Sequence, residues 1–159
     1  MDPLDEVAPA FVEMAHRIVW CTVATVDRSG RPRTRVLHPI WEWDGTVLTG
    51  WIATDPASLK AKHLEAVPEV SLTYWAPDHD TCTAEASVAW LDDVEARSAV
   101  WDHFEHGPEP VGYDPRIVPG WDSPSAPRFG VIELSPRALR VMDGSVMLRG
   151  EGRVLRWQL

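Results

Sequence analysis

Four arginines lie within eight positions of this chain: Arg28, Arg31, Arg33 and Arg35. Guanidinium groups bind phosphates and carboxylates through paired, charge-assisted hydrogen bonds. The run therefore indicates a local anion-binding site. The same residues would equally suit a solvated hairpin edge that its charge protects from aggregation.

The two cysteines, Cys21 and Cys82, are too few for a disulfide framework and form no CxxC pair. We expect buried free thiols on strands. A catalytic thiol would need a pKa lowered by nearby cationic or histidine groups, and the sequence identifies no such group beside either cysteine.

His103, Glu105 and His106 lie at the end of a predicted helix. Three-residue spacing places both histidines on one helical face, as a metal site would require. No third His or Cys follows at a recognisable spacing, and histidines in a last turn interact favourably with the negative end of the helix. We interpret them as helix-capping residues and expect no metal.

The elements that must position these groups follow from the hydrophobic pattern. Helical spacing predicts an amphipathic helix over about residues 3–17. β-branched and aromatic residues predict strands at 18–26, 31–43 and 46–52, separated by turns at 27–30 and 44–45. Asp55-Pro56 predicts the start of a helix that ends near residue 66, with an inward face of Leu59, His63 and Ala66.

The second half of the chain continues the pattern with strands at 70–75 and 81–91 and a helix at 93–105. Further strands are predicted at 129–134, 138–142, 145–149 and 153–157. Six prolines between residues 107 and 127 exclude regular structure there and favour a lid or binding loop. Trp121 within it must be buried against a pocket or a partner subunit.

Consecutive hairpins interrupted by one helix predict an α+β fold: a small antiparallel barrel with peripheral helices. A length of 159 residues predicts one domain, residues 1–159. The formal net charge of −9 repels polyphosphate backbones, so we expect no nucleic-acid partner. With no long apolar stretch and no basic leader, we also expect a cytoplasmic protein without membrane contact.

Three stretches resemble the flavin-binding split-barrel family that includes the pyridoxamine 5′-phosphate oxidases: residues 21–50, 58–75 and, more loosely, 128–144. The middle stretch is the most specific. Its Ser58-Leu59-Lys60-Ala61 segment, Leu64 and the strand entry at 67–72 have the spacing typical of that family.

The resemblance implies a split barrel that binds FMN, a flat ring joined to a dianionic phosphate. By the family pattern, phosphate contacts come from Arg35, Ser58 and Lys60. Ring and backbone contacts come from Val36, Leu37, Thr49 and Gly50. Helix N-termini favour anions independently of any family.

The chain also departs from the family pattern. Ile40 and Leu59 stand where family members often carry cations, and His38 or Lys62 could compensate. A deazaflavin coenzyme, which relatives use, is therefore the alternative cofactor. The chain has no histidine after His106, so the Arg-x-His signature of true pyridoxamine phosphate oxidases is absent.

The implied function is an FMN-dependent oxidoreductase acting on an unidentified small molecule. A deazaflavin-dependent reductase and a non-catalytic flavin carrier or sensor are the alternatives. No catalytic residue is assigned, because the flavin itself performs hydride chemistry. Family members complete each site from two subunits, which implies a homodimer, and Trp121 is the candidate on the substrate side.

Overall fold

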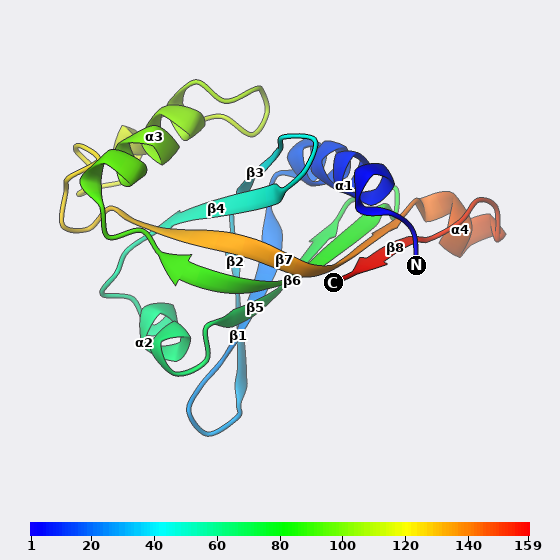
Figure 1. The fold of residues 1–159 in the computed structure, drawn as a ribbon, viewed down its shortest axis with the longest axis horizontal. Helices are drawn as coiled ribbons and strands as arrows, with labels where there is room; N and C mark the ends of the chain where they lie inside the picture. Colours follow the sequence, from blue (N-terminus) through cyan, green and yellow to red (C-terminus); the bar gives the residue numbers. More distant parts are fainter.

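The computed structural model describes all residues, 1–159, as an eight-stranded antiparallel sheet with helices around it (Figure 1). The strands are β1 (Cys21–Val26), β2 (Pro32–Leu37), β3 (Ile40–Trp43), β4 (Leu48–Thr54), β5 (Glu69–Trp75), β6 (Thr81–Trp90), β7 (Gly130–Met142) and β8 (Leu155–Gln158). The helices are α1 (Leu4–Ile18), α2 (Leu59–Ala66), α3 (Val94–Glu105) and α4 (Gly144–Arg149), with a 3₁₀ turn η1 at Pro115–Ile117. None of these helices is long and apolar enough to cross a membrane.

The sheet is an open, split barrel. Its strand order is β2-β1-β5-β6-β7-β4-β3, with β8 paired to the second half of β7. The two edge strands, β2 and β3, follow one another in the chain and are joined only by His38-Pro39. The sheet must therefore curl until its edges meet. Because proline lacks an N–H and restricts the residue before it, the edges do not form a ladder there.

The main hydrophobic core fills the inside of this barrel, and α1 closes it. Val7, Phe11 and Met14 on one face of α1 pack with strand residues in a cluster of 21 buried residues. A second cluster of nine residues joins α3, the proline-rich loop and the start of β7, around Phe104 and Phe129. This second cluster holds the loop against the barrel rather than leaving it in solvent.

The predicted helices at 3–17 and 93–105 and the strands at 70–75 and 81–91 are confirmed within a few residues. The strand predicted from Ile18 begins only at Cys21, because α1 continues to Ile18. The strand predicted over 31–43 is two strands, since Pro39 interrupts it.

The helix after Asp55-Pro56 begins three residues later than expected, and the inward face was wrong at two of its three positions. Ala61, His63 and Leu64 are buried, whereas Leu59 and Ala66 are exposed. Two predicted strands, 129–134 and 138–142, are one strand, β7. Pro136 is tolerated because it lies beside a bulge in β7, where Arg137 is the extra residue and the ladder with β6 is interrupted.

The predicted strand over residues 145–149 is wrong: the segment is the short helix α4. Asp143 precedes the helix, the Gly144 N–H donates to Asp80 Oδ1 at 2.7 Å, and Gly150 ends it in the left-handed conformation. A short apolar run of this kind is compatible with either a strand or a helix. The contact with the turn at residues 78–80 stabilises the helix.

Candidate functional site

An apolar cleft of about 380 Å³ opens between the end of β2 and the proline-rich loop. Its walls are Val19, Trp20, Val36, Leu37, His38, Ala53, Pro110, Gly112, Tyr113, Ile117, Val118 and Trp121. The structure thus brings together four residues that the sequence singled out from separate segments: Val36, Leu37, His38 and Trp121. A cleft with apolar walls and a few polar atoms is suited to a flat organic ligand.

His38 lies at the centre of the aromatic wall of the cleft. Its ring centroid is 4.9 Å from that of Tyr113 and 5.0 Å from that of Trp20. Burial lowers the pKa of His38, partly opposed by the Val111 backbone, so the imidazole is neutral at pH 7. Its Nε2 is buried without a hydrogen-bond partner. A ligand in the cleft could supply that partner.

Trp20 reaches the cleft through a strained turn. Val19 has φ 72° and ψ −62°, and the Trp20 N–H donates to the Ile18 carbonyl oxygen at 2.9 Å, which makes a γ-turn. A β-branched residue in this conformation is a genuine outlier. The turn leaves the Trp20 side chain 58% exposed at the rim.

The predicted phosphate-binding residues form a cationic group beside this cleft. Lys60 Nζ donates to Ser58 Oγ at 3.0 Å at the start of α2. Arg35 Nη1 donates to the carbonyl oxygens of Val23 and Arg33, each at 3.0 Å. Burial, followed by the nearby Arg35, lowers the pKa of Lys60, while Asp55 opposes the shift. The two cations are close together, and neither forms an ion pair.

Thr49 and Gly50 do not line the cleft. Gly50 lies on β4 against Trp41, where an added Cβ would come within 2.5 Å of the Trp41 ring. Thr49 is opposite Glu42 in the β3–β4 ladder. Within one chain, Gly50 allows β4 to pack closely against Trp41 in the core. Its position in the sequence alone does not indicate this role.

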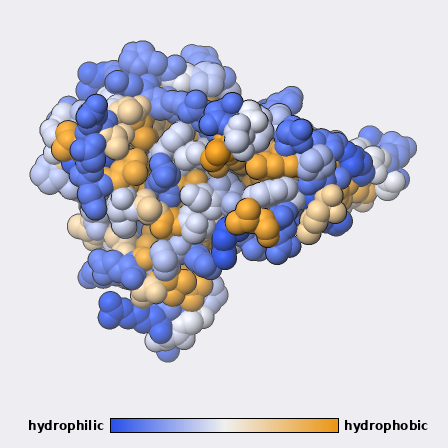
Figure 2. Space-filling view, in the orientation of Figure 1, coloured by the Kyte–Doolittle hydropathy of each residue, from blue (hydrophilic) through white to orange (hydrophobic).

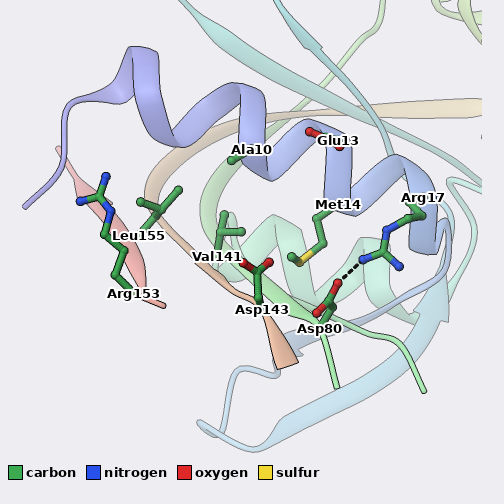
Figure 3. Close-up of a pocket in the computed structure, with 9 residues that line it drawn as sticks. All are labelled: Ala10, Glu13, Met14, Arg17, Asp80, Val141, Asp143, Arg153 and Leu155. Carbon is green, nitrogen blue, oxygen red and sulfur yellow. Dashed lines mark hydrogen bonds and ion pairs between the residues drawn. The ribbon is translucent and has the colours of Figure 1, made fainter. Parts of the chain in front are cut away.

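A second pocket, of about 390 Å³, lies between α1, β7 and β8 (Figure 3). Its cations already have carboxylate partners. Arg17 pairs with Asp78 and Asp80, as the dashed line to Asp80 in Figure 3 shows. Arg153, at the other end, pairs with Asp2 and Glu6. Because both arginines already have carboxylate partners, the pocket offers no free cation to an anionic ligand.

The histidines of α3 have separate surroundings. His106 is the C-cap residue of the helix, and its Nδ1 lies 3.1 Å from the Asp102 carbonyl oxygen, as the capping interpretation expects. Ligand atoms of Asp102, Glu105 and His106 lie within 4.8 Å of one another. However, Glu105 already pairs with Arg116.

His103 lies 3.8 Å from a Glu42 oxygen and stacks edge-on against Trp51. Both cysteines are buried and free. Burial raises the pKa of Cys21 to about 12 and raises that of Cys82 further, so neither carries a thiolate.

Sequence reasoning did not name two aromatic residues of the cleft as site residues. Tyr113 belongs to the apolar residues of the proline-rich loop whose burial the sequence predicts, and burial raises its pKa to about 12. Trp20 was placed inside a predicted strand. No local pattern marks the turn at Val19 that turns Trp20 toward the cleft.

Residues 7–143 match the family described as pyridoxamine 5′-phosphate oxidase. A solved Clostridium acetobutylicum protein related to Bacillus subtilis general stress protein 26 is 11% identical at a TM-score of 0.69. The match covers 100% of this chain and 97% of that one. A pyridoxamine 5′-phosphate oxidase-related, FMN binding protein from Nostoc punctiforme is 19% identical at a TM-score of 0.68. The match covers 99% of this chain and 90% of that one.

A heme binding protein from Mycobacterium smegmatis is 14% identical at a TM-score of 0.61, covering 99% of this chain and 59% of that one. At these identities the likeness is one of fold. No curated protein matches the chain.

Proposed function

The chain belongs to the pyridoxamine 5′-phosphate oxidase family, and from that premise we propose that it is an FMN-dependent oxidoreductase acting on a small molecule in the apolar cleft. One observation carries the proposal. An aromatic cleft lies at the end of strand β2. The same strand bears Arg35, which has no carboxylate partner and which lies close to Lys60 at the start of α2.

The cleft supports the apolar half of such a ligand. Val36 and Leu37 offer aliphatic contacts to a flat ring, and the His38 Nε2 would gain the hydrogen-bond partner that it lacks. Leaving a buried polar nitrogen unpaired costs about 1–3 kcal/mol. A ring nitrogen or carbonyl group placed here would remove that cost.

The cationic group supports the anionic half. Arg35, Ser58 and Lys60 present donors at the start of a helix, where backbone N–H groups add to the field. Burial of two like charges lowers the pKa of Lys60. A bound phosphate would offset the repulsion between Arg35 and Lys60, because it supplies the negative charge that neither cation has as an ion-pair partner in the protein.

A bound flavin would supply the hydride chemistry of the reaction. The protein's own contribution is to exclude water and to orient the reactants. Trp121 and Tyr113 wall off the cleft on the side of the loop. His38, held neutral by burial, can donate or accept one hydrogen bond without adding charge.

We also propose that two copies of the chain complete each site. Three large apolar side chains at the rim of the cleft are more than half exposed: Trp20, Val36 and Ile117. Contiguous exposed apolar surface of this kind marks an interface. A second copy on this rim would cover these residues and deepen the cleft.

A deazaflavin-dependent reductase is the second candidate. Ile40 and Leu59 stand where family members often carry cations. Ile40 is buried in the second core cluster and Leu59 is exposed, and neither side chain adds a positive charge to the phosphate site. A weaker phosphate site would suit a cofactor with a different tail. A non-catalytic flavin carrier would need only the binding residues.

The purified protein tests the proposal. We expect it to be yellow, or to become so with added FMN. Its visible absorption should bleach when a reduced nicotinamide is supplied and return when a substrate candidate that accepts the hydride is then added. Retained colour without turnover would favour the carrier. A protein that binds neither FMN nor a deazaflavin coenzyme would end both flavin proposals, and a heme spectrum would point to a different ligand.

A further inference from the structure

The walls of the apolar cleft carry no charged side chain. None of its 12 lining residues is Asp, Glu, Lys or Arg, and nine of them are hydrophobic. Burial keeps His38 neutral and raises the pKa of Tyr113 to about 12, so neither adds a charge at pH 7. Figure 2 shows hydrophobic residues between hydrophilic ones over α3 and the adjoining end of the sheet, where Figure 1 places α3 and the loop that follows it.

The backbone N–H groups on the loop side of the cleft are already in use. Four of them donate to carbonyl oxygens of the loop or of α3, at 2.8–3.0 Å: those of Gly112, Tyr113, Val118 and Trp121. Pro110, on the same wall, has no N–H. Because an anionic group in an apolar cleft needs several donors, the loop side offers no place for a phosphate or a carboxylate.

The large side chains of the loop present rings rather than polar atoms. Trp121 donates its ring N–H to the Arg128 carbonyl oxygen at 2.8 Å, so this N–H is not available to a ligand. The Tyr113 ring lies against His38, with the two ring planes at 36°. Ring faces of this kind pack well against another flat ring.

One polar atom of the cleft has no partner. Three buried side-chain polar atoms of the protein lack a hydrogen-bond partner, and only His38 Nε2 belongs to the cleft. A nitrogen of a neutral imidazole makes one hydrogen bond, and an uncharged polar group is sufficient for it. The cleft therefore provides for a single uncharged polar group on its ligand.

The cations nearest to the site do not change this balance. Arg35 and Lys60 do not line the cleft, and in the proposed function they bind the phosphate of the cofactor. An anionic substrate would therefore lie beside a bound phosphate without a cation of its own. Burial of an unpaired charge in apolar surroundings is costly.

We propose that the cleft takes as substrate an uncharged aromatic molecule with one polar substituent, which hydrogen-bonds to His38 Nε2, and that it discriminates against molecules that carry a phosphate or a carboxylate. This inference rests on the proposed function and names its substrate class. Trp121 and Tyr113 would select for the flat ring, and His38 for the polar substituent.

Two ligands that differ mainly in charge test the inference. 2-Naphthalenemethanol carries a hydroxymethyl group where 2-naphthoate carries a carboxylate, on the same ring system. Each is titrated by calorimetry into the FMN-loaded protein, or into the protein as purified if it binds no FMN. We expect 2-naphthalenemethanol to bind at least about tenfold more tightly, because the carboxylate loses water without gaining donors.

A matched pair of variants tests whether the missing charge is the cause. Val118 is a partly exposed residue of the cleft wall. Val118→Arg adds a cation there, whereas Val118→Gln adds polar atoms without charge. We expect Val118→Arg to reduce the preference for 2-naphthalenemethanol by at least about fivefold, since a guanidinium binds a carboxylate, and Val118→Gln to change it by less than about twofold.

The His38→Leu variant tests the polar contact. It should bind 2-naphthalenemethanol about two- to tenfold more weakly, the effect of one lost hydrogen bond. Its affinity for naphthalene, which has no polar group, should change by less than about twofold. An equal change for both ligands would contradict the contact with His38.

Equal affinity of the wild type for the two naphthalene derivatives, tighter binding of 2-naphthoate, or binding of neither would overturn the inference. So would equal preferences in Val118→Arg and Val118→Gln. FMN binding without discrimination between the two ligands would leave the proposed function intact and reject the substrate class. Discrimination by a protein that binds no flavin would support the ligand class of the cleft and reject the proposed function.

Discussion

At the scale of single residues, the site depends on two cations that have no carboxylate partner and on one nitrogen that has no hydrogen-bond partner within the protein. Arg35 and Lys60 lie close together and are partly buried, yet neither pairs with a carboxylate. His38 Nε2 is buried and unpaired. Such groups destabilise a fold unless a ligand satisfies them, so they are the first residues to substitute.

Substitution of Arg35 or Lys60 by alanine should weaken cofactor binding. A charge-assisted hydrogen bond to phosphate contributes roughly 1.5–3 kcal/mol, or about one to two decades in affinity. Titration of FMN, followed by quenching of its fluorescence, measures the change. Arg28→Ala, at the exposed turn, should have little effect on FMN, and equal effects at all three positions would contradict a formed phosphate site.

His38 should also make the stability of the ligand-free protein depend on pH. Burial lowers its pKa, so the folded state favours the neutral ring, and burial acts likewise on His16. This stability is complete above the unfolded pKa of about 6.5 and is lost as the pH falls through that value toward the folded pKa. Urea unfolding should therefore give a lower free energy at pH 5 than at pH 7.

The His38→Gln variant should show a shallower decline over the same pH range, since one of the two imidazoles whose pKa is lowered by burial is gone. A variant profile parallel to that of the wild type would mean that His38 titrates alike in the folded and unfolded states.

At the scale of elements, the site depends on two close contacts that hold β4 and the proline-rich loop in place. Gly50 lets β4 pass against the Trp41 ring. Trp121 anchors the loop by donating its ring N–H to the Arg128 carbonyl oxygen at 2.8 Å and by packing edge-on against Phe129.

Gly50→Ala should destabilise the protein by about 1–3 kcal/mol, the typical cost of forcing an extra methyl group into a packed core. Chemical denaturation measures the loss, and Thr49→Ala on the same strand is the control. Unchanged stability together with weaker FMN binding would instead assign Gly50 a direct contact with the cofactor.

Trp121→Phe keeps an aromatic ring but removes the hydrogen bond to Arg128. If the loop closes over the substrate side, this variant should change turnover or the Michaelis constant while leaving cofactor affinity nearly intact. Trp121→Ala should in addition lower the free energy of unfolding by about 3–5 kcal/mol. Normal kinetics in Trp121→Phe with a lowered melting temperature would make Trp121 a packing residue only.

At the scale of the whole molecule, the exposed apolar rim of the cleft should hold two copies together. We expect light scattering at micromolar concentration to give the mass of two 17.8 kDa chains. Ile117→Glu, which puts a charge on a residue that is 71% exposed at the rim, should shift the protein toward monomer. Met147→Glu alters an exposed apolar residue on α4, away from the cleft, and is the control.

A monomer that still binds cofactor would contradict shared sites. A dimer that both variants leave intact would place the interface elsewhere.

The sequence by itself determined the features that local patterns encode. Alternating and β-branched residues marked β5 and β6, helical spacing marked α1 and α3, and the motifs around Arg35 and Ser58 indicated the family that the match over residues 7–143 identifies. Predictions from local patterns were wrong where a short segment could form either a strand or a helix. Residues 144–149 became a helix through a contact with the distant turn at residues 78–80.

Only the tertiary structure decided which of the candidate residues meet. Trp20, His38 and Tyr113 come from three segments, and the joining of the sheet edges at His38-Pro39 brings them to one cleft. Gly50, in contrast, is directed into the core. The position of a side chain in space depends on packing between residues far apart in the chain, and a single sequence does not display those contacts.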